Sequence, residues 1–237
     1  MRSVAWFKYG TFDSQGYALE IENTIEFPSP EKDVEYIKVA GRSGEVAITD
    51  GTYKNVDYNI DCVVRTHLGD TPYFAQELGK FKTPNTWQDL TFSWDSDYIY
   101  KGLITDKWEW ERKSDQLHKV TIPIKVKPFK YTKAGQTEIS TATVTNPTKF
   151  TADPSITITG SGNMVIDFWG VQHTFSGVSG GLVIDTENQV VYDLSGKVAW
   201  DKIKTYPLPK IPTGTSNYRV VSGTATVKYR PNFKTLV

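Results

Sequence analysis

The sequence is short of the residues from which most metal and redox sites are built. Its 237 residues include one cysteine, Cys62, and three histidines, His67, His118 and His173. A single cysteine excludes an intramolecular disulfide and a cysteine-based zinc site within one chain. No two histidines lie at metal-ligand spacing, so each is expected to be a surface or strand histidine. We therefore expect neither a metal site nor a cofactor.

Long apolar runs and an excess of one charge are also missing. Basic and acidic residues are equal in number, 27 each, and a nucleic-acid-binding protein would usually be basic. The N-terminus leads into no apolar run of signal-peptide length, and no stretch approaches the roughly 18 apolar residues of a membrane span. We expect a protein folded in a reducing cytoplasm, with no nucleic-acid partner and no membrane partner.

Motifs that mark catalysis are absent as well. There is no Gly-x-Ser-x-Gly elbow and no phosphate-binding Gly-x-x-x-x-Gly-Lys-Ser/Thr loop. Two carboxylate pairs, Asp95 with Asp97 and Asp185 with Glu187, match no calcium loop, so turn capping is the preferred interpretation. Paired carboxylates for glycoside hydrolysis stay open, because their spacing is spatial. We predict no catalytic, cofactor-binding or metal-binding residue, and no enzyme.

What the sequence does contain is alternation with a period of two. Residues 58–64 and 120–126 alternate apolar and other side chains, as half-buried strands do. Pro123 interrupts the second run and predicts an edge strand or a bulge, because proline cannot donate to a ladder. Three aromatic groups, at 90–94, 98–100 and 108–110, are interpreted as a long hairpin.

One segment has the pattern of a helix. Across residues 70–81, Asp70 or Thr71 can cap the first turn, and three apolar residues fall on one face: Phe74, Leu78 and Phe81. The composition changes near residue 131, where we place a domain boundary. Turns then separate short strands at 155–159, 164–169, 171–175, 182–185, 190–193 and 218–229, a spacing typical of a β-sandwich.

Aromatic residues make up 13% of the chain and include seven tryptophans. The segment Trp108-Glu109-Trp110 places two indoles on one face of a strand. Core packing, a sugar-stacking platform and a subunit interface are all open interpretations. For an interface, the sequence offers these candidates: Trp94, Tyr98, Tyr100, Trp108 and Trp110.

Several short motifs, taken in order, resemble the distal tail protein (Dit) family of siphophages. Each is weak alone, and their order and spacing carry the resemblance over most of the chain. They lie at residues 41–45, 50–55, 94–102, 122–131, 146–147, 153–156, 181–185 and 211–214. The sequence departs from the family at 213–217, where the usual Pro-x-Gly-x-Asn element is stretched.

The resemblance implies a mainly β fold of two β-sandwich domains. Residues 1–130 would form a ring-building domain with one short α-helix, and residues 131–237 a galectin-like domain outside the ring. It also implies a non-enzymatic hub of a bacteriophage tail tip, present in the virion. A homo-hexamer would join the tail tube protein to the tail-associated protein, and in many phages such a ring holds receptor-binding proteins. The alternative is a carbohydrate-binding module for host cell-surface polysaccharide.

Overall fold

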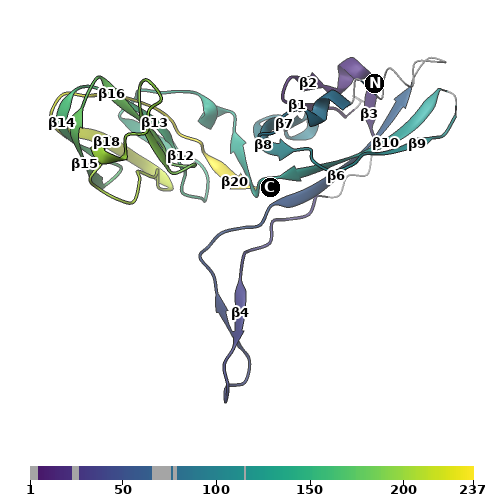
Figure 1. Cartoon of the computed structure of the whole chain (residues 1–237), viewed down its shortest axis with the longest axis horizontal. Helices are drawn as coiled ribbons and strands as arrows, with labels where there is room; N and C mark the ends of the chain where they lie inside the picture. The colour runs from purple at the N-terminus through teal and green to yellow at the C-terminus, as the bar shows by residue number, and fades with distance from the viewer. Residues whose placement is uncertain (1–4, 23–26, 66–75, 77–78, 115) are drawn as a thin grey trace. The chain divides into compact units, whose positions relative to one another are not determined.

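The chain is mainly β and divides into two compact units (Figure 1). The computed structural model describes residues 5–22, 27–65, 76, 79–114 and 116–237. Unit 1 comprises Met1–Lys130 and Leu236–Val237, and unit 2 comprises Tyr131–Thr235. The chain therefore passes between the units twice, once in each direction.

The large sheet of unit 1 has the strand order β2-β1-β7-β8-β10-β6-β3, with β9 paired to β10 and β11 paired to β8 and β20. Short 3-10 turns lie between the strands at Ser14–Tyr17, Lys80–Lys82 and Ser93–Asp95. The strands are β1 (Phe7–Tyr9), β2 (Phe12–Asp13), β3 (Leu19–Ile21), β6 (Val56–Arg65), β7 (Gln88–Phe92), β8 (Tyr98–Leu103), β9 (Glu109–Arg112), β10 (Leu117–Val126), β11 (Phe129–Thr132) and β20 (Lys234–Leu236). The last two strands each cross the limit between the units.

Strands β6 and β10 form the centre of this unit and confirm the predicted alternation. They pair antiparallel without interruption from Leu117↔Arg65 to Val126↔Val56. Their alternate residues point into one core, so Ile60 and Ile122 are almost fully buried. Period-two alternation produces this arrangement because successive strand side chains leave opposite faces of the sheet.

The expectation that Pro123 marks an edge strand or a bulge is wrong. β10 lies inside the sheet, and Pro123 pairs in register with Asn59 of β6. On its other side β10 pairs with β9 at His118–Thr121 and with β8 at Lys125–Val126. Pro123 thus lies in the interval between two partner strands, where a missing amide hydrogen interrupts neither ladder.

The long aromatic hairpin is partly confirmed. β7 and β8 pair antiparallel, with Leu90 opposite Tyr100. The third aromatic group does not continue this hairpin, because β9 pairs with β10 and places Trp110 opposite Val120. The choice of partner is non-local, and alternation within a strand carries no information about it.

The predicted helix at 70–81 falls mostly outside the described residues, and so do Phe74 and Leu78. Within that segment, Gln76 and Gly79 are helical, and a 3-10 turn covers Lys80–Lys82. Phe81 is buried in the core of unit 1. The packing of the predicted helix therefore stays a prediction.

A long hairpin, called the arm below, occupies residues 31–54 of unit 1. Its strands β4 (Glu35–Lys38) and β5 (Glu45–Ile48) pair only with each other among the described strands. Figure 1 shows the arm extending from β6 as a narrow ribbon. The sequence predicts a loop with strand ends at 20–35, and a strand at 46–48 followed by a turn at Asp50-Gly51. The ends of β3 and β4 and the position of β5 agree with these predictions, but the pairing of β4 with β5 into an arm is not foreseen.

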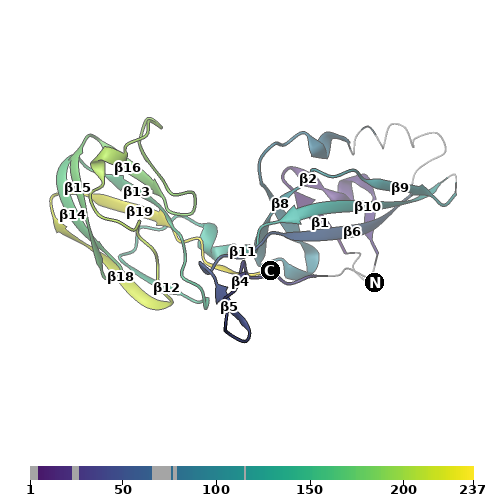
Figure 2. The ribbon, with the colours of Figure 1, turned by 60° about the horizontal axis from the view of Figure 1, so that its bottom comes forward.

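Unit 2 is a sandwich of two antiparallel sheets, β12-β18-β14-β15 and β17-β16-β13-β19 (Figure 2). Both inner faces contribute to one core, which includes Phe168, Phe175 and Tyr229. Two 3-10 turns lie at Ala134–Gln136 and Trp200–Lys202. The strands are β12 (Thr143–Asn146), β13 (Ser155–Thr159), β14 (Gly162–Phe168), β15 (Val171–Val178), β16 (Gly181–Asp185), β17 (Val190–Asp193), β18 (Gly214–Ser222) and β19 (Thr226–Arg230).

The strand expected at 218–229 is instead two strands in different sheets. β18 ends at Ser222, and β19 begins at Thr226 in the opposite sheet. Gly223 lies between them with φ +81°. A Cβ at this position would come 2.7 Å from the carbonyl oxygen of Asn163. Only glycine fits both the left-handed conformation and the close approach, so the turn depends on it.

Candidate interaction surfaces

The first candidate surface surrounds Trp94 in unit 1. The Trp94 ring stacks on Phe92 with centroids 4.7 Å apart and meets Phe27 at 5.6 Å. Phe92 also contacts Tyr100 edge-on at 5.2 Å. Trp94 remains 42% exposed and Phe27 48% exposed. An aromatic pair supported by a buried ring, with both partners open to water, has the composition of an interface anchor.

The Asp95 carboxylate links Lys130 and Tyr100 in this region. Its carboxylate lies 2.5 Å from Lys130 Nζ and accepts a short hydrogen bond from the Tyr100 hydroxyl. Lys130 Nζ also lies 4.4 Å from the centre of the Tyr98 ring. Burial raises the pKa of Tyr58 to about 12, and the Asp95 charge adds to that rise.

Trp108 and Trp110 have different neighbours from Trp94. Trp108 stacks on Phe81 with centroids 5.9 Å apart, and Trp110 lies 5.1 Å from the ring of buried His118. Both are half-buried and pack against the core of unit 1, whereas Tyr100 is part of that core. The structure therefore brings Trp94, Tyr98 and Tyr100 to one region, and gives Trp108 and Trp110 mainly packing contacts.

The arm is the second candidate surface. Its base is held by aromatic contacts, Tyr53 on Phe129 at 5.7 Å and, just before the arm, Phe27 on Tyr58 at 5.7 Å. Further along, apolar side chains face water: Tyr36 is 64% exposed and Ile48 51% exposed. A two-stranded ribbon is marginally stable in water by itself. The sequence predicts the second strand of the arm, at 46–48, but not its pairing with the first, since each strand is short and neither face is buried.

A hollow of about 330 Å³ lies beside the β1–β2 turn of unit 1. The rings of Phe12, Tyr17 and Phe81 contact one another there, with Tyr17 and Phe81 5.8 Å apart. Lys80 contributes a cationic side chain to the lining, and Gln88 an amide. An apolar hollow with a few polar groups is the usual form of a binding pocket.

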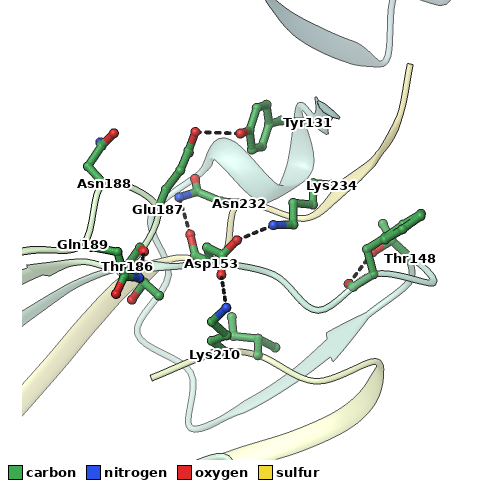
Figure 3. Close-up of polar contacts among 12 residues, drawn as sticks. Tyr131, Thr148, Asp153, Thr186, Glu187, Asn188, Gln189, Lys210, Asn232 and Lys234 are labelled. Carbon is green, nitrogen blue, oxygen red and sulfur yellow. Dashed lines mark hydrogen bonds and ion pairs between the residues drawn. The ribbon is translucent and has the colours of Figure 1, made fainter. Parts of the chain in front are cut away.

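Unit 2 contains a network of polar contacts around Asp153, drawn in Figure 3. The carboxylate makes an ion pair with Lys234 and another, at 3.3 Å, with Lys210. Its backbone carbonyl accepts a hydrogen bond of 2.9 Å from Asn232 Nδ2. The Asp153 and Lys234 side chains are only 15% and 16% exposed. The network fixes the last segment of unit 2 to the strip before β13.

A second contact in Figure 3 fixes the first segment of unit 2. The Tyr131 hydroxyl donates a 2.8 Å hydrogen bond to Glu187 Oε1. Burial, followed by the nearby Glu187 charge, raises the pKa of Tyr131 well above its usual range. Asp185 accepts hydrogen bonds from Asn188 N at 3.0 Å and Asn188 Nδ2 at 2.7 Å. Asp185 is thus a turn-capping residue, which confirms that interpretation for it.

Exposed rings in unit 2 form a third candidate surface. Tyr206 is 57% exposed and stacks on half-buried Trp200, with centroids 6.0 Å apart. The strip that carries them is pinned to β15 by the Lys204 N to Thr174 O hydrogen bond of 2.9 Å. Buried Ile203 anchors the same strip. The rings therefore lie on a fixed support.

The described part of the chain contains no cluster of three or more His, Cys, Asp or Glu side chains that could hold a metal ion. His118 and His173 are buried strand residues, and His67 lies outside the described residues. The ring nitrogens of His173 lie 3.0 Å from the carbonyl oxygens of Val171 and Pro207. Across the described ranges, no helix is long and apolar enough to span a membrane.

Comparison with known proteins gives a structural match but no sequence match. No protein-family model matches the chain, and no curated protein does. The structure is similar to the crystal structure of SPP1 Dit (gp 19.1), described as a paradigm of the hub adsorption apparatus in phages that infect Gram-positive bacteria. The TM-score is 0.75 at 16% identity, over 99% of this chain and 100% of that one. The chain therefore has the two-domain, mainly β fold of a Dit protein.

Proposed function

We propose that this chain is a structural, non-enzymatic hub of a bacteriophage tail tip. Six copies form a ring, built mainly by residues 1–130, with a galectin-like unit of residues 131–237 outside it. The ring joins the tail tube protein to the tail-associated protein and offers its rim to receptor-binding proteins. The chain is made in the host cytoplasm and ends in the virion.

The observation that carries this proposal is the extent of the fold match. A shared sandwich alone would indicate little, because many unrelated functions use that architecture. Here the likeness to a phage hub protein extends over 99% of the chain and includes both units. The order of the sequence motifs supports the same role independently of the coordinates.

The five aromatic residues predicted for the interface contribute unequally to this proposal. Trp94 is the exposed member and suits a ring contact directly, since buried aromatic anchors dominate interface energies. Tyr100 contacts Phe92, the ring on which Trp94 stacks, and Tyr98 lies beside Lys130, the ion-pair partner of Asp95. Trp108 packs against Phe81, and Trp110 packs against His118, so both stabilise unit 1 itself.

The experiment is a mass measurement on the full chain at rising concentration, by light scattering, with electron microscopy of the same samples. Rings of six chains are expected. Trp94→Ala should raise the concentration needed for assembly, whereas Val221→Ala, an exposed apolar residue of unit 2 (45% exposed), should not. A chain that stays monomeric up to about millimolar concentration, far above the micromolar range of ordinary complexes, would contradict the ring.

Carbohydrate binding by unit 2 is a second candidate function, favoured by the exposed Tyr206 ring on its fixed strip. An open aromatic face can stack against the C–H face of a sugar. Titration with cell-wall polysaccharide, followed by tryptophan fluorescence, would report binding through Trp200. A titration with no saturable change, matched by an identical trace for Tyr206→Ala, would remove this candidate.

A further inference from the structure

A second hollow, of about 200 Å³, lies in unit 2 at the end of the β16–β17 pair. Its lining carries charged side chains of both signs, the carboxylates of Asp193 and Asp201 and the ammonium groups of Lys197 and Lys202. The hydroxyl of Ser179 adds a neutral polar group. Because the charges of the lining balance, it favours a neutral ligand that both donates and accepts hydrogen bonds over a polyanion or a polycation.

The walls of this hollow are fixed by hydrogen bonds of their own. Asp193 Oδ1 accepts from Ser195 N at 2.9 Å and from Lys197 N at 3.0 Å. On the other side, Lys202 N donates to Ala199 O at 3.1 Å. A ligand therefore has little of the site left to order, and such preorganisation reduces the entropic cost of binding.

Two of the charged groups form a pair that matches adjacent hydroxyls of a sugar. Lys202 Nζ lies 2.9 Å from Asp201 Oδ2, and the two side chains are 35% and 70% exposed. The hydrogen bond from Lys202 lowers the pKa of Asp201, so the carboxylate stays ionised. A third cation, Lys204, is bound to the Asp201 carbonyl oxygen at 2.6 Å and does not belong to the lining.

The fit to a vicinal diol follows from this geometry. Neighbouring hydroxyls on a sugar ring are about as far apart as the Lys202 nitrogen and the Asp201 oxygen. One hydroxyl can therefore donate to the carboxylate while the other accepts from the ammonium group. Hydrogen bonds to ionised groups are the stronger kind, so the pair offers selectivity as well as affinity.

The turn that holds this ion pair also holds the exposed rings of unit 2. Trp200, Asp201 and Lys202 are consecutive residues of one 3-10 turn. Tyr206 stacks on Trp200 with centroids 6.0 Å apart. Val198, which is 62% exposed, adds apolar surface to the lining of the hollow. A sugar presents both matching chemistries, a C–H face for an aromatic ring and hydroxyls along its edge.

We propose that unit 2 binds a neutral glycan, with one sugar stacked on Tyr206 and the vicinal hydroxyls of a neighbouring sugar held by Asp201 and Lys202 in the hollow. This inference rests on the second candidate function, carbohydrate binding by unit 2, and names its ligand class and a subsite. A single shallow site binds weakly, whereas several copies in one assembly bind a polymer with avidity.

Titration of the full chain, followed by NMR, tests the ligand class. The probes are 1,4-linked glucose and galactose hexamers, which have a vicinal diol on every ring. Chitohexaose, in which an acetamide replaces the 2-hydroxyl, is the matched control, and an oligogalacturonide is the anionic probe. A neutral diol probe should shift the amide signals of Gly181, Lys197 and Lys202 saturably, and chitohexaose should bind about tenfold more weakly. Equal binding of chitohexaose, or binding of the anionic probe alone, contradicts the proposed recognition.

Side-chain variants test the subsite. Asp201→Asn and Lys202→Met should each lower the affinity about tenfold, because a hydrogen bond to a charged group is lost. Tyr206→Ala should lower it by a similar factor through the lost stacking contact. Glu138→Gln and Lys228→Met alter an exposed ion pair elsewhere in unit 2 and should leave the affinity unchanged. Exposed ion pairs contribute little to stability, so all four polar variants should remain folded.

The outcomes separate the subsite from carbohydrate binding itself. If Tyr206→Ala weakens binding while Asp201→Asn and Lys202→Met do not, the hollow is not the subsite and carbohydrate binding by unit 2 stands. Equal losses in the two control variants overturn the subsite in the same way. If no probe binds at concentrations up to about 10 mM, both the subsite and the second candidate function are overturned. The proposed ring is unaffected by any of these results, because it is assigned to residues 1–130.

Discussion

The ion pairs of Asp153 should contribute to the stability of unit 2, because they hold its last segment against the residues before β13. Asp153→Asn keeps the size of the side chain and the backbone carbonyl that accepts from Asn232, but it removes the charge that faces Lys234 and Lys210. The change therefore isolates the two ion pairs from the rest of the network.

The expected magnitude follows from burial. Asp153 and Lys234 are about 15% exposed, between a surface pair, which contributes about 0–1 kcal/mol, and a buried pair, whose disruption costs about 3–5 kcal/mol. We expect Asp153→Asn to lower the free energy of unfolding of unit 2 by about 1.5–3 kcal/mol. Lys210 is 49% exposed, so its share should be small.

Double-mutant cycles on the full chain measure each share. Coupling between Asp153→Asn and Lys234→Met should be about 1–2 kcal/mol, and coupling with Lys210→Met below about 0.5 kcal/mol. Calorimetry gives the stability, and hydrogen exchange at the amides of Thr132 and Asn232 reports local opening, since both amides are bonded at the ends of unit 2. Equal couplings for the two lysines would refute the burial argument.

Other perturbations test other parts of the fold. Ile122→Ala, in the core of unit 1, should cost about 2–5 kcal/mol by calorimetry; a loss below about 0.5 kcal/mol would show that the site is not packed. Cys62, with its pKa raised to about 12 by burial, should resist a thiol reagent until the chain is denatured. Folding raises the pKa of Tyr58 from 10.0 to about 12, so its contribution to the free energy of unfolding is complete below pH 10 and is lost as pH rises toward 12. In Tyr58→Phe, the free energy of unfolding should therefore fall less between pH 10 and pH 12. Gly223→Ala should cost more than Gly162→Ala, which has a similar φ of +92° but open space around it; equal losses in calorimetry would exclude the clash with Asn163.

Strands with one buried face could be predicted from the sequence, and most of the core came from them. The alternation at 58–64 and 120–126 identifies β6 and β10, and the ranges 155–159 and 190–193 coincide with β13 and β17. Partner choice could not be predicted in the same way. Trp110 pairs with Val120 rather than continuing the β7–β8 hairpin, and this depends on contacts distant in the sequence.

The candidate surfaces were harder to predict, for a physical reason. Exposure depends on what the rest of the chain covers, so five aromatic residues of similar pattern have different environments, from open Trp94 to buried Tyr100. In the arm, only the strand at 46–48 is predicted from the sequence, because the arm lacks a buried face and its two four-residue strands are too short for a clear periodic pattern. Asp153 has no sequence signal beyond its place in the motif at 153–156, because its lysine partners are 57 and 81 residues away in the sequence (Lys210 and Lys234).

The chain enters and leaves unit 2 at neighbouring points. Thr132 N donates to Phe233 O at 2.9 Å, and Asn232 N donates to Gly135 O at 2.8 Å, so the two ends of the unit are held together by its own backbone. A domain whose two ends lie close together can be removed, replaced or enlarged by insertion or deletion in the gene without displacing the chain before and after it. Variation within unit 2 can therefore accumulate independently of the core of unit 1.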